Sequence, residues 1–159
     1  MTGPSKLTLT EEAWAEISRH AVEAFPEECC GVILDLGGSD EARRLRNIQN
    51  RLHALDSESY PRDATIAYAM DPRELEAIVL EAEVGGAKIK AFYHSHPGHE
   101  AYFSEEDKTF ATPFGEPTYP ESAQIVISIY DRTVKRICAY AWLEKDKDFV
   151  AIPLRRLAR

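Results

Sequence analysis

Two helical segments with well-marked ends, set between apolar extended segments, restrict the folds that this chain can adopt. The first helix is expected over about residues 11–25, with Thr10 at its N-cap and Pro26 after its end. The second is expected to begin with the Asp-Pro-Arg-Glu sequence at 71–74 and to stop at the two glycines at 85–86. Extended segments surround both helices without strict strand–helix alternation. The pattern therefore predicts an α+β fold or a three-layer α/β/α sandwich around a mixed sheet.

Apolar or alternating runs predict the strands of that sheet. These runs are residues 7–9, 31–36, 41–48, 65–70, 88–96, 124–130, 134–142 and 149–154. We expect a loop over residues 49–63, a short helix that begins at Ser104, and a proline-rich loop after it. Since neither a repeat nor a linker divides the sequence, residues 1–159 are expected to form a single domain.

Composition narrows the classes of partner. The 159 residues carry 19 Lys and Arg against 27 Asp and Glu, a formal charge of −8, so the chain offers no basic stripe for nucleic acid. We interpret the one basic cluster, Arg155, Arg156 and Arg159, as a solvated tail. No apolar run approaches the ~18–20 residues that span a bilayer, and the N-terminus lacks an apolar signal-peptide core. We therefore expect a cytoplasmic protein without a nucleic-acid or membrane partner.

Cysteine usage agrees with a reducing compartment. The three cysteines are Cys29, Cys30 and Cys138, and an odd number with an adjacent pair is a poor disulfide framework. We expect them to act as small apolar side chains rather than as nucleophiles or metal ligands.

The segment after the second helix carries the residues with the clearest chemical potential. His94 and His96 are two apart on an expected strand, so both imidazoles leave the same face and can reach one metal ion. Asp107 falls in the first turn of a helix capped by Ser104, from which its carboxylate can reach back over the histidines. Two His and one carboxylate leave a fourth tetrahedral position open, which is the arrangement of a catalytic zinc.

Plainer interpretations of these residues remain open. A His-x-His pair on a strand also occurs as a solvated or hydrogen-bonded pair, and Ser104-x-x-Asp107 is also an ordinary helix start. His99 follows a turn and is expected to be exposed or to support a ligand rather than to be one. Glu28 lies between the first helix and a buried strand, where it is either a solvated acid or the general base that a metal-activated water requires.

Three motifs together resemble a known family. They are Glu28-x-Cys30-Gly31, His94-Ser95-His96-Pro97 and Ser104-x-x-Asp107. In order and spacing they are similar to the full JAMM motif of the MPN-plus (Mov34/MPN/PAD-1) zinc metallopeptidases. The resemblance covers about residues 7–142, which we take as the core of the domain.

The resemblance implies a fold, a cofactor and a role for each motif residue. The implied fold is the cytidine-deaminase-like α/β/α sandwich with a mixed central sheet. One Zn²⁺ per chain would be held by His94, His96 and Asp107. Glu28 would be the general base, and Ser104 would stabilise the oxyanion. Because every residue of the motif is retained, an enzyme is favoured over a non-catalytic MPN interaction module.

The resemblance also implies a class of substrate. Family members cleave after the C-terminal Gly-Gly of ubiquitin-like proteins, whose tails bind in a groove beside the zinc. The stretch from Phe92 to Ser104 is similar to stand-alone prokaryotic peptidases that process sulfur-carrier proteins (ThiS/MoaD-like), releasing a C-terminal residue or cysteine. The alternative is a prokaryotic deubiquitinase-like isopeptidase that removes ubiquitin-like modifiers. Residues 108–122, with Phe110, Phe114 and Tyr119, are expected either to line the tail groove or to form a rigid connection.

Two other metal families match part of the string. His94-x-His96-x-x-His99 resembles the metallo-β-lactamase signature, but that fold requires Asp where this chain has Gly98. The spacing from His94 and His96 to Glu100 resembles a cupin half-motif, but the two expected helices contradict a jelly roll.

Overall fold

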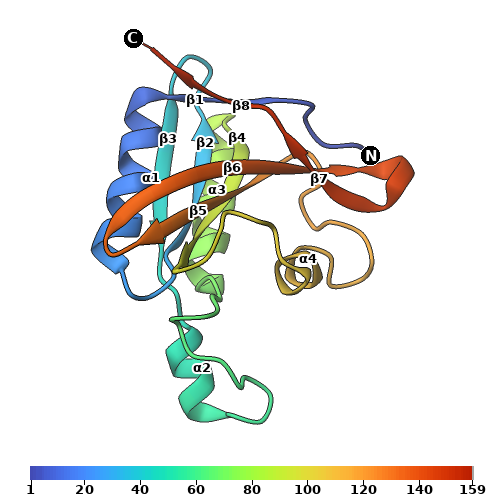
Figure 1. Cartoon of the computed structure of the whole chain (residues 1–159). Helices are drawn as coiled ribbons and strands as arrows, with labels where there is room; N and C mark the ends of the chain where they lie inside the picture. Colours follow the sequence, from blue (N-terminus) through green and yellow to red (C-terminus); the bar gives the residue numbers. More distant parts are fainter. Residues whose placement is uncertain (159) are drawn as a thin grey trace.

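A six-stranded mixed sheet forms the centre of the molecule in the computed structural model, which describes residues 1–158 (Figure 1). In spatial order its strands are β3 (Asp40–Leu45), β2 (Cys30–Asp35), β4 (Lys88–Pro97), β5 (Ala123–Tyr130), β6 (Thr133–Leu143) and β7 (Asp148–Ile152). Neighbours β4 and β5 run parallel, and the other neighbours run antiparallel. The predicted mixed sheet is confirmed.

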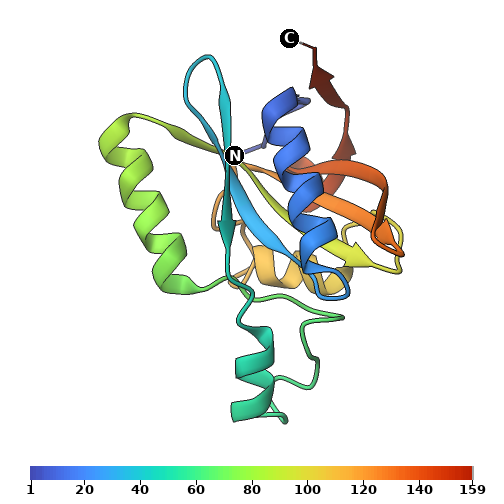
Figure 2. The ribbon, with the colours of Figure 1, turned by 90° about the vertical axis from the view of Figure 1, so that its left-hand side faces the viewer.

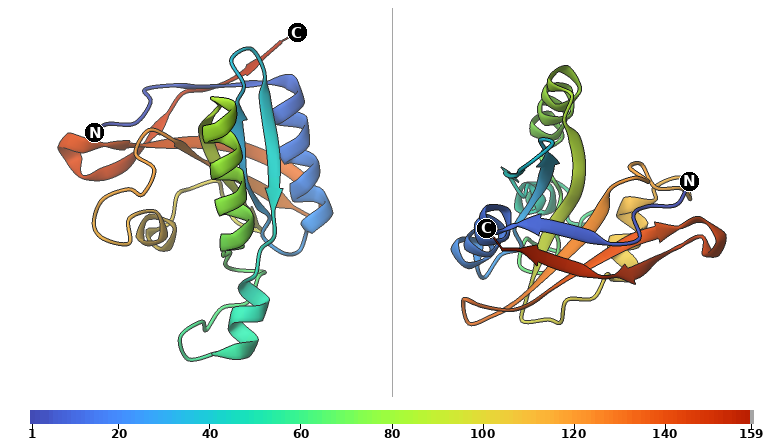
Figure 3. Two further views of the ribbon diagram at one scale, coloured as in Figure 1. Left: turned by 180° about the vertical axis from the view of Figure 1, so that it is seen from behind. Right: turned by 90° about the horizontal axis from the view of Figure 1, so that it is seen from above.

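Helices cover both faces of this sheet. Figures 2 and 3 show α1 (Glu11–Ala24) and α3 (Pro72–Gly85) on opposite sides of the β2–β3 hairpin. Ile17 of α1 packs in one apolar cluster with inward residues of β2, β4 and β5, while Ile78 of α3 packs in a second cluster with Val32 and Phe92. The predicted three-layer α/β/α arrangement is therefore confirmed.

Both long helices have the ends that the sequence predicts. The Thr10 hydroxyl accepts a hydrogen bond from the Ala13 amide at 3.4 Å, and the Asp71 carboxylate accepts one from the Arg73 amide at 2.9 Å. At the end of α3, Gly86 adopts φ 72°, a left-handed conformation that closes the helix and favours glycine.

In residues 46–71, which we call the α2 excursion, the structure differs from two expectations. The expected loop at 49–63 contains helix α2 (Gln49–Leu55), which lies away from the sheet at the bottom of Figure 1. The expected strand at 65–70 is wrong, because this segment makes only one isolated bridge, Met70 with Asn47. Side chains replace the missing strand partners: the amides of Ala64 and Ala69 donate to Asn50 and Asn47.

The C-terminal segment also differs from the expectation of one strand at 149–154. Pro153 separates β7 from β8 (Leu154–Leu157), and β8 pairs in parallel with β1 (Leu7–Thr10) in a second sheet of two strands. Arg155 and Arg156 therefore belong to a strand and not to a solvated tail. Arg156 donates to Glu11 at 2.6 Å and lies over the Trp14 ring. Arg159 lies outside the described residues.

Two short helices complete the described chain: α4 (Glu105–Ala111) and a 3₁₀ turn, η1 (Glu144–Asp146). All three cysteines are free thiols, as expected. Among residues 1–158, no helix is long and apolar enough to cross a membrane.

A close approach between β2 and β4 requires glycine at position 31. A Cβ on Gly31 would lie 2.5 Å from the Arg43 carbonyl oxygen and 2.5 Å from two ring carbons of Tyr93. The Tyr93 ring is fully buried, and its hydroxyl lies 2.7 Å from Nδ1 of His20. Because burial lowers the pKa of His20 to about 4, the imidazole is neutral at pH 7 and shares a single hydrogen bond with the Tyr93 hydroxyl.

We predict that Gly31→Ala lowers the free energy of unfolding by about 1–3 kcal/mol, because the ring has no space into which to retreat. Urea denaturation measures this loss. Gly38→Ala is the matched control, since a Cβ there meets nothing within 4 Å and should change stability by less than about 0.5 kcal/mol. Equal stability of the two variants would contradict the packing argument.

Candidate metal centre

The two histidines occupy a central strand that is paired on both sides. His94 lies opposite Cys30 of β2 and opposite Val126 of β5, so neighbouring strands fix its backbone. Both rings leave the same face of β4 and are buried, with exposed fractions of 1% for His94 and 6% for His96. The strand alternation predicted from the sequence is confirmed.

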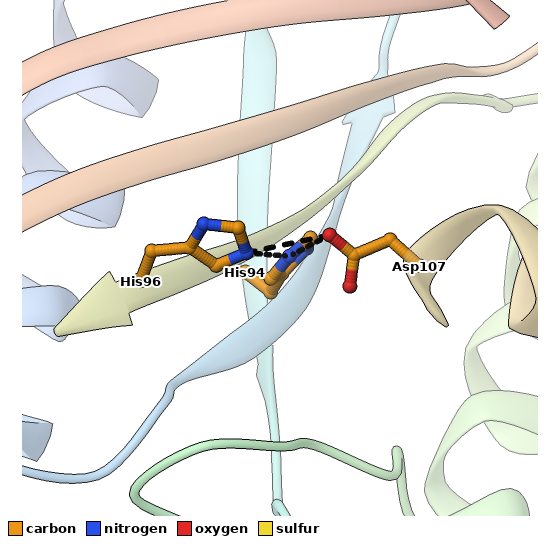
Figure 4. Close-up of side chains that lie close together, drawn as sticks. All are labelled: His94, His96 and Asp107. Carbon is orange, nitrogen blue, oxygen red and sulfur yellow. Dashed lines mark hydrogen bonds and ion pairs between the residues drawn. The ribbon is translucent and has the colours of Figure 1, made fainter. Parts of the chain in front are cut away.

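A capping box brings Asp107 to the histidines. The Ser104 hydroxyl accepts a hydrogen bond from the Asp107 amide at 3.0 Å, and the Ser104 amide donates to Oδ2 of Asp107 at 3.0 Å. The same Oδ2 lies 3.2 Å from Nε2 of His94 and 3.3 Å from Nε2 of His96 (Figure 4). One local motif therefore both starts α4 and directs its carboxylate at the strand.

The three facing atoms have the geometry of metal ligands. The two Nε2 atoms lie 3.1 Å apart, so the three separations are 3.1, 3.2 and 3.3 Å. A tetrahedral ion with bonds of ~2.0–2.1 Å places its ligands about 3.3–3.4 Å apart, close to these values. Nδ1 of His96 donates to the Glu100 carbonyl at 2.9 Å, which leaves the Nε2 lone pair free for a metal. His94, His96 and Asp107 thus form a buried group that can hold a metal ion.

The surroundings of Asp107 and His94 favour the ionisation states that a cation requires. Burial alone would raise the pKa of Asp107, but attraction to His94 and the hydrogen bonds with both histidines lower it far below its ordinary value. Burial lowers the pKa of His94, which keeps this imidazole neutral. For His96 burial is the largest single influence and lowers the pKa. The hydrogen bonds with Asp107 and the Glu100 carbonyl, together with the charges of Asp107 and Glu28, outweigh it and raise the pKa, so a metal ion has to displace a proton from this ring.

Glu28 and Ser104 line the same cavity as the metal-binding group. The cavity has a volume of about 210 Å³, and His96 and Asp107 also line it. Glu28 is 7% exposed, and burial, with the charge of Asp107 as a further cause, raises its pKa to about 8. Because the Ser104 hydroxyl oxygen accepts the Asp107 amide, its own proton is free to be donated elsewhere. The cavity thus combines a proton acceptor, a hydrogen-bond donor and a metal-binding group.

Nothing in the sequence indicates that Tyr68, Arg62 and Glu106 line this cavity. Tyr68 stacks on His94, with ring centroids 4.4 Å apart and an interplanar angle of 23°. Arg62 donates to Glu106 at 2.6 Å, which links the α2 excursion to α4. No local motif marks an aromatic ring or an ion pair that is completed only by the tertiary fold.

The remaining candidates take different places. His99 lines the cavity but does not join the metal-binding group, in agreement with the expectation. Phe110 and Tyr119 line a second cavity of about 390 Å³, which shares Tyr68 and Phe110 with the first. Phe114 is 95% exposed. Only part of the segment 108–122 therefore faces this pair of adjoining cavities.

The sequence pattern of the prokaryotic homologs of the JAB domain matches residues 10–142. The chain belongs to this family. The predicted resemblance to prokaryotic JAB/MPN proteins is thereby confirmed. The JAB-family chain is also 31% identical to a desampylase from Haloferax volcanii over 112 residues, which cover 68% of this chain and 74% of that relative.

Solved structures share the fold of this JAB-family chain. A protein from Desulfitobacterium hafniense matches with a TM-score of 0.70 and 23% identity, over 96% of this chain and 94% of that one. A protein from Salinibacter ruber matches with a TM-score of 0.60 and 22% identity, over 95% and 91% of the two chains. A JAB1/MPN domain protein from Archaeoglobus fulgidus matches with a TM-score of 0.50 and 17% identity, over 94% and 99%.

We predict that Glu28 makes the stability of the metal-free JAB-family protein depend on pH. Between about pH 4.5 and 8 the folded state holds the Glu28 proton and the unfolded state releases it. The free energy of unfolding therefore falls as pH rises through this window, by at most about 1.4 kcal/mol per pH unit. Urea denaturation in the presence of a chelator, for wild type and Glu28→Gln, measures the difference. Identical pH dependence of the two proteins would refute the raised pKa.

Proposed function

We propose that this protein is a zinc-dependent metallopeptidase of the JAMM type. In this proposal it hydrolyses the peptide or isopeptide bond that follows the C-terminal Gly-Gly of a ubiquitin-like or sulfur-carrier protein. The observation that carries the proposal is the convergence of His94, His96 and Asp107 within 3.3 Å of one another, in a cavity that Glu28 and Ser104 also line. Two imidazoles and one carboxylate suit zinc and leave one tetrahedral position for water.

Each residue has one task in the proposed hydrolysis. His94, His96 and Asp107 hold the ion, which when bound supplies a Lewis acid for the scissile carbonyl and lowers the pKa of water. Glu28 takes a proton from the attacking water and passes it to the leaving amine. The Ser104 hydroxyl donates to the carbonyl oxygen as negative charge develops there, an interaction worth about 2.7–4 kcal/mol in comparable sites.

The pKa of Glu28 suits a proton carrier. At a pKa of about 8 the carboxylate holds a proton well enough to remove it from water, and a cation nearby would shift the balance toward the ionised base.

Two kinds of bond remain candidates within the same chemistry. The desampylase from Haloferax volcanii favours an isopeptide bond to a ubiquitin-like modifier. The similarity of Phe92–Ser104 to peptidases of sulfur carriers favours release of a C-terminal residue. Both substrates present a flexible tail, and the proposal is that this tail binds in the second cavity, which adjoins the first through Tyr68 and Phe110.

We predict that variants of the metal ligands lose zinc, whereas a variant of the base keeps zinc and loses activity. His94→Ala or Asp107→Ala should lose stoichiometric zinc, because two ligands hold the ion poorly. Glu28→Gln should retain one zinc per chain while its kcat falls by at least about 100-fold, since general-base catalysis contributes ~10²–10⁴-fold. Elemental analysis and kinetics on each variant measure both properties.

Glu105→Gln is the control for these variants, because Glu105 is an exposed acid of the same helix as Asp107. Zinc content and kcat should both match the wild type. Full activity in Glu28→Gln would remove Glu28 from the role of base.

The substrate test uses two proteins and a chelator. A sulfur carrier extended beyond Gly-Gly and an isopeptide conjugate of a ubiquitin-like protein are each incubated with the enzyme, and the products are weighed by mass spectrometry. We expect cleavage immediately after Gly-Gly that stops when the chelator is present. Cleavage of the carrier alone assigns peptide-bond processing, and cleavage of the conjugate alone assigns deconjugation. If neither is cleaved by the zinc-loaded protein, the proposed function is wrong.

A further inference from the structure

The side chain of Asn47 forms four hydrogen bonds with backbone groups. Its Nδ2 donates to the carbonyl oxygens of Glu28 at 2.9 Å and Ala67 at 3.2 Å. Its Oδ1 accepts from the amides of Gln49 and Ala69, each at 3.0 Å. An asparagine amide has two N–H donors and two acceptor positions, so every one of them is used. Asn47 is half-buried, and it also forms an isolated β-bridge with Met70.

These bonds join two segments that reach the metal centre independently. One is the segment just before β2, in which Glu28 and Cys29 precede the first strand residue, Cys30. The other is the end of the α2 excursion, where Ala67 and Ala69 flank Tyr68. Tyr68 stacks on the metal-binding His94, and Glu28 lines the catalytic cavity. All four of these hydrogen bonds go to backbone groups and none to the side chain of Glu28 or Tyr68. Asn47 therefore bonds to the backbone of Glu28 itself and to the residues on either side of Tyr68.

Glu28 is held between the α2 excursion and the metal strand. Its amide donates to the Ala64 carbonyl at 2.7 Å, and its carbonyl accepts from Asn47. The next residue, Cys29, donates to the Ser95 hydroxyl at 2.8 Å and accepts from the Ser95 amide at 3.1 Å. Ser95 separates the two histidines in the sequence. The backbone at residue 28 is thus fixed from both sides, and one of those sides is the excursion that Asn47 organises.

Glu28 lies two residues before Cys30, the first residue of β2, so the sheet ladder does not hold its carbonyl. The Asn47 amide takes that place and holds the backbone at residue 28 ahead of the strand. A reacting carboxylate must be placed to within a fraction of an ångström, because a displacement of about 1 Å can cost ~10²-fold in rate.

We propose that Asn47 is a positioning residue of this site, which holds the Glu28 carboxylate and the Tyr68 ring at the metal centre through the backbone of residues 28 and 67–69. The catalytic half of this inference rests on the proposed function, because it takes Glu28 as the base. The structural half, that Asn47 orders the backbone at Glu28, stands without it.

Two variants separate the donors of Asn47 from its acceptors. Asn47→Asp keeps an oxygen for the amides of Gln49 and Ala69 but removes both N–H donors, so Glu28 loses its bond. Asn47→Ala removes all four bonds. With zinc bound at one per chain, we expect kcat on the cleaved Gly-Gly substrate to fall about 10- to 100-fold in both variants, with KM changed by less than about threefold.

Asp71→Ala is the control for lost stability. Asp71 lies at the other end of the same excursion and caps α3, so its loss costs about 1 kcal/mol without touching the bonds of Glu28 or Tyr68. Its kcat should stay within about twofold of wild type at a temperature well below both melting temperatures. If the Asn47 variants also stay within twofold, the positioning role is overturned.

Hydrogen exchange of the Glu28 amide tests the structural half without any substrate. This amide bonds to Ala64 and not to Asn47, so it reports the order of the segment rather than the deleted bond itself. We expect its exchange to accelerate at least about tenfold in Asn47→Ala and to remain unchanged in Asp71→Ala. An unchanged rate in Asn47→Ala overturns the inference. If wild type cleaves no substrate but the Glu28 amide does accelerate, the proposed function fails and the positioning of residue 28 stands.

Discussion

The antiparallel pairing of β2 with β4 is the interaction on which the rest of this site depends. It places Cys30 opposite His94 and joins Cys29 to Ser95, so Glu28, two residues before the strand, lines the same cavity as His96 and Asp107. Because side chains alternate along a strand, a slip of one residue would turn His94 and His96 to the opposite face. Gly31 secures this register, since only glycine permits the Tyr93 ring to lie against its Cα. Packing on one face of the sheet therefore fixes the chemistry on the other.

Burial of four ionisable groups at one place makes the site costly for the fold. Glu28, His94, His96 and Asp107 are all buried, and apolar surroundings disfavour charge on any of them unless it is paired. The pKa values of the two carboxylic acids shift in opposite directions. Asp107 is bonded to both histidines and remains ionised, whereas Glu28 holds its proton to about pH 8. Environments that push two acids apart in this way are typical of a site with one ligand and one proton carrier. The arrangement is understandable as preparation for a cation.

The sequence predicts those parts of the molecule that local rules determine. Neighbouring residues are sufficient to predict the helix caps at Thr10 and Asp71 and the alternation of side chains along β4. The structure agrees with these predictions. The metal-binding group follows from the same rules, since strand alternation pairs the histidines and a capping box directs Asp107. Local rules leave Glu28 either a solvated acid or a general base, because the pairing that brings it to the cavity is long-range.

The errors concentrate where side chains far apart in the sequence supply the backbone's partners. Residues 65–70 read as a strand in the sequence, yet Asn47 accepts the Ala69 amide, Asn50 accepts that of Ala64 just before the segment, and the segment is irregular. Parallel pairing of β8 with β1 joins the two ends of the described chain and has no local signature. Tyr68 was missed for the same reason, because only the irregular course of this segment turns its ring onto His94.

Ser104 shows why structure and chemistry cannot be separated in this site. Its hydroxyl oxygen accepts the Asp107 amide, and its own amide donates to the Asp107 carboxylate, so it starts α4 and aims a metal ligand at the same time. The proton of that hydroxyl is what the proposed mechanism uses for the oxyanion. The bond that this oxygen accepts fixes its position, while the hydroxyl proton remains free to turn toward a substrate oxygen. In the proposed mechanism the same residue is therefore both a helix cap and a hydrogen-bond donor.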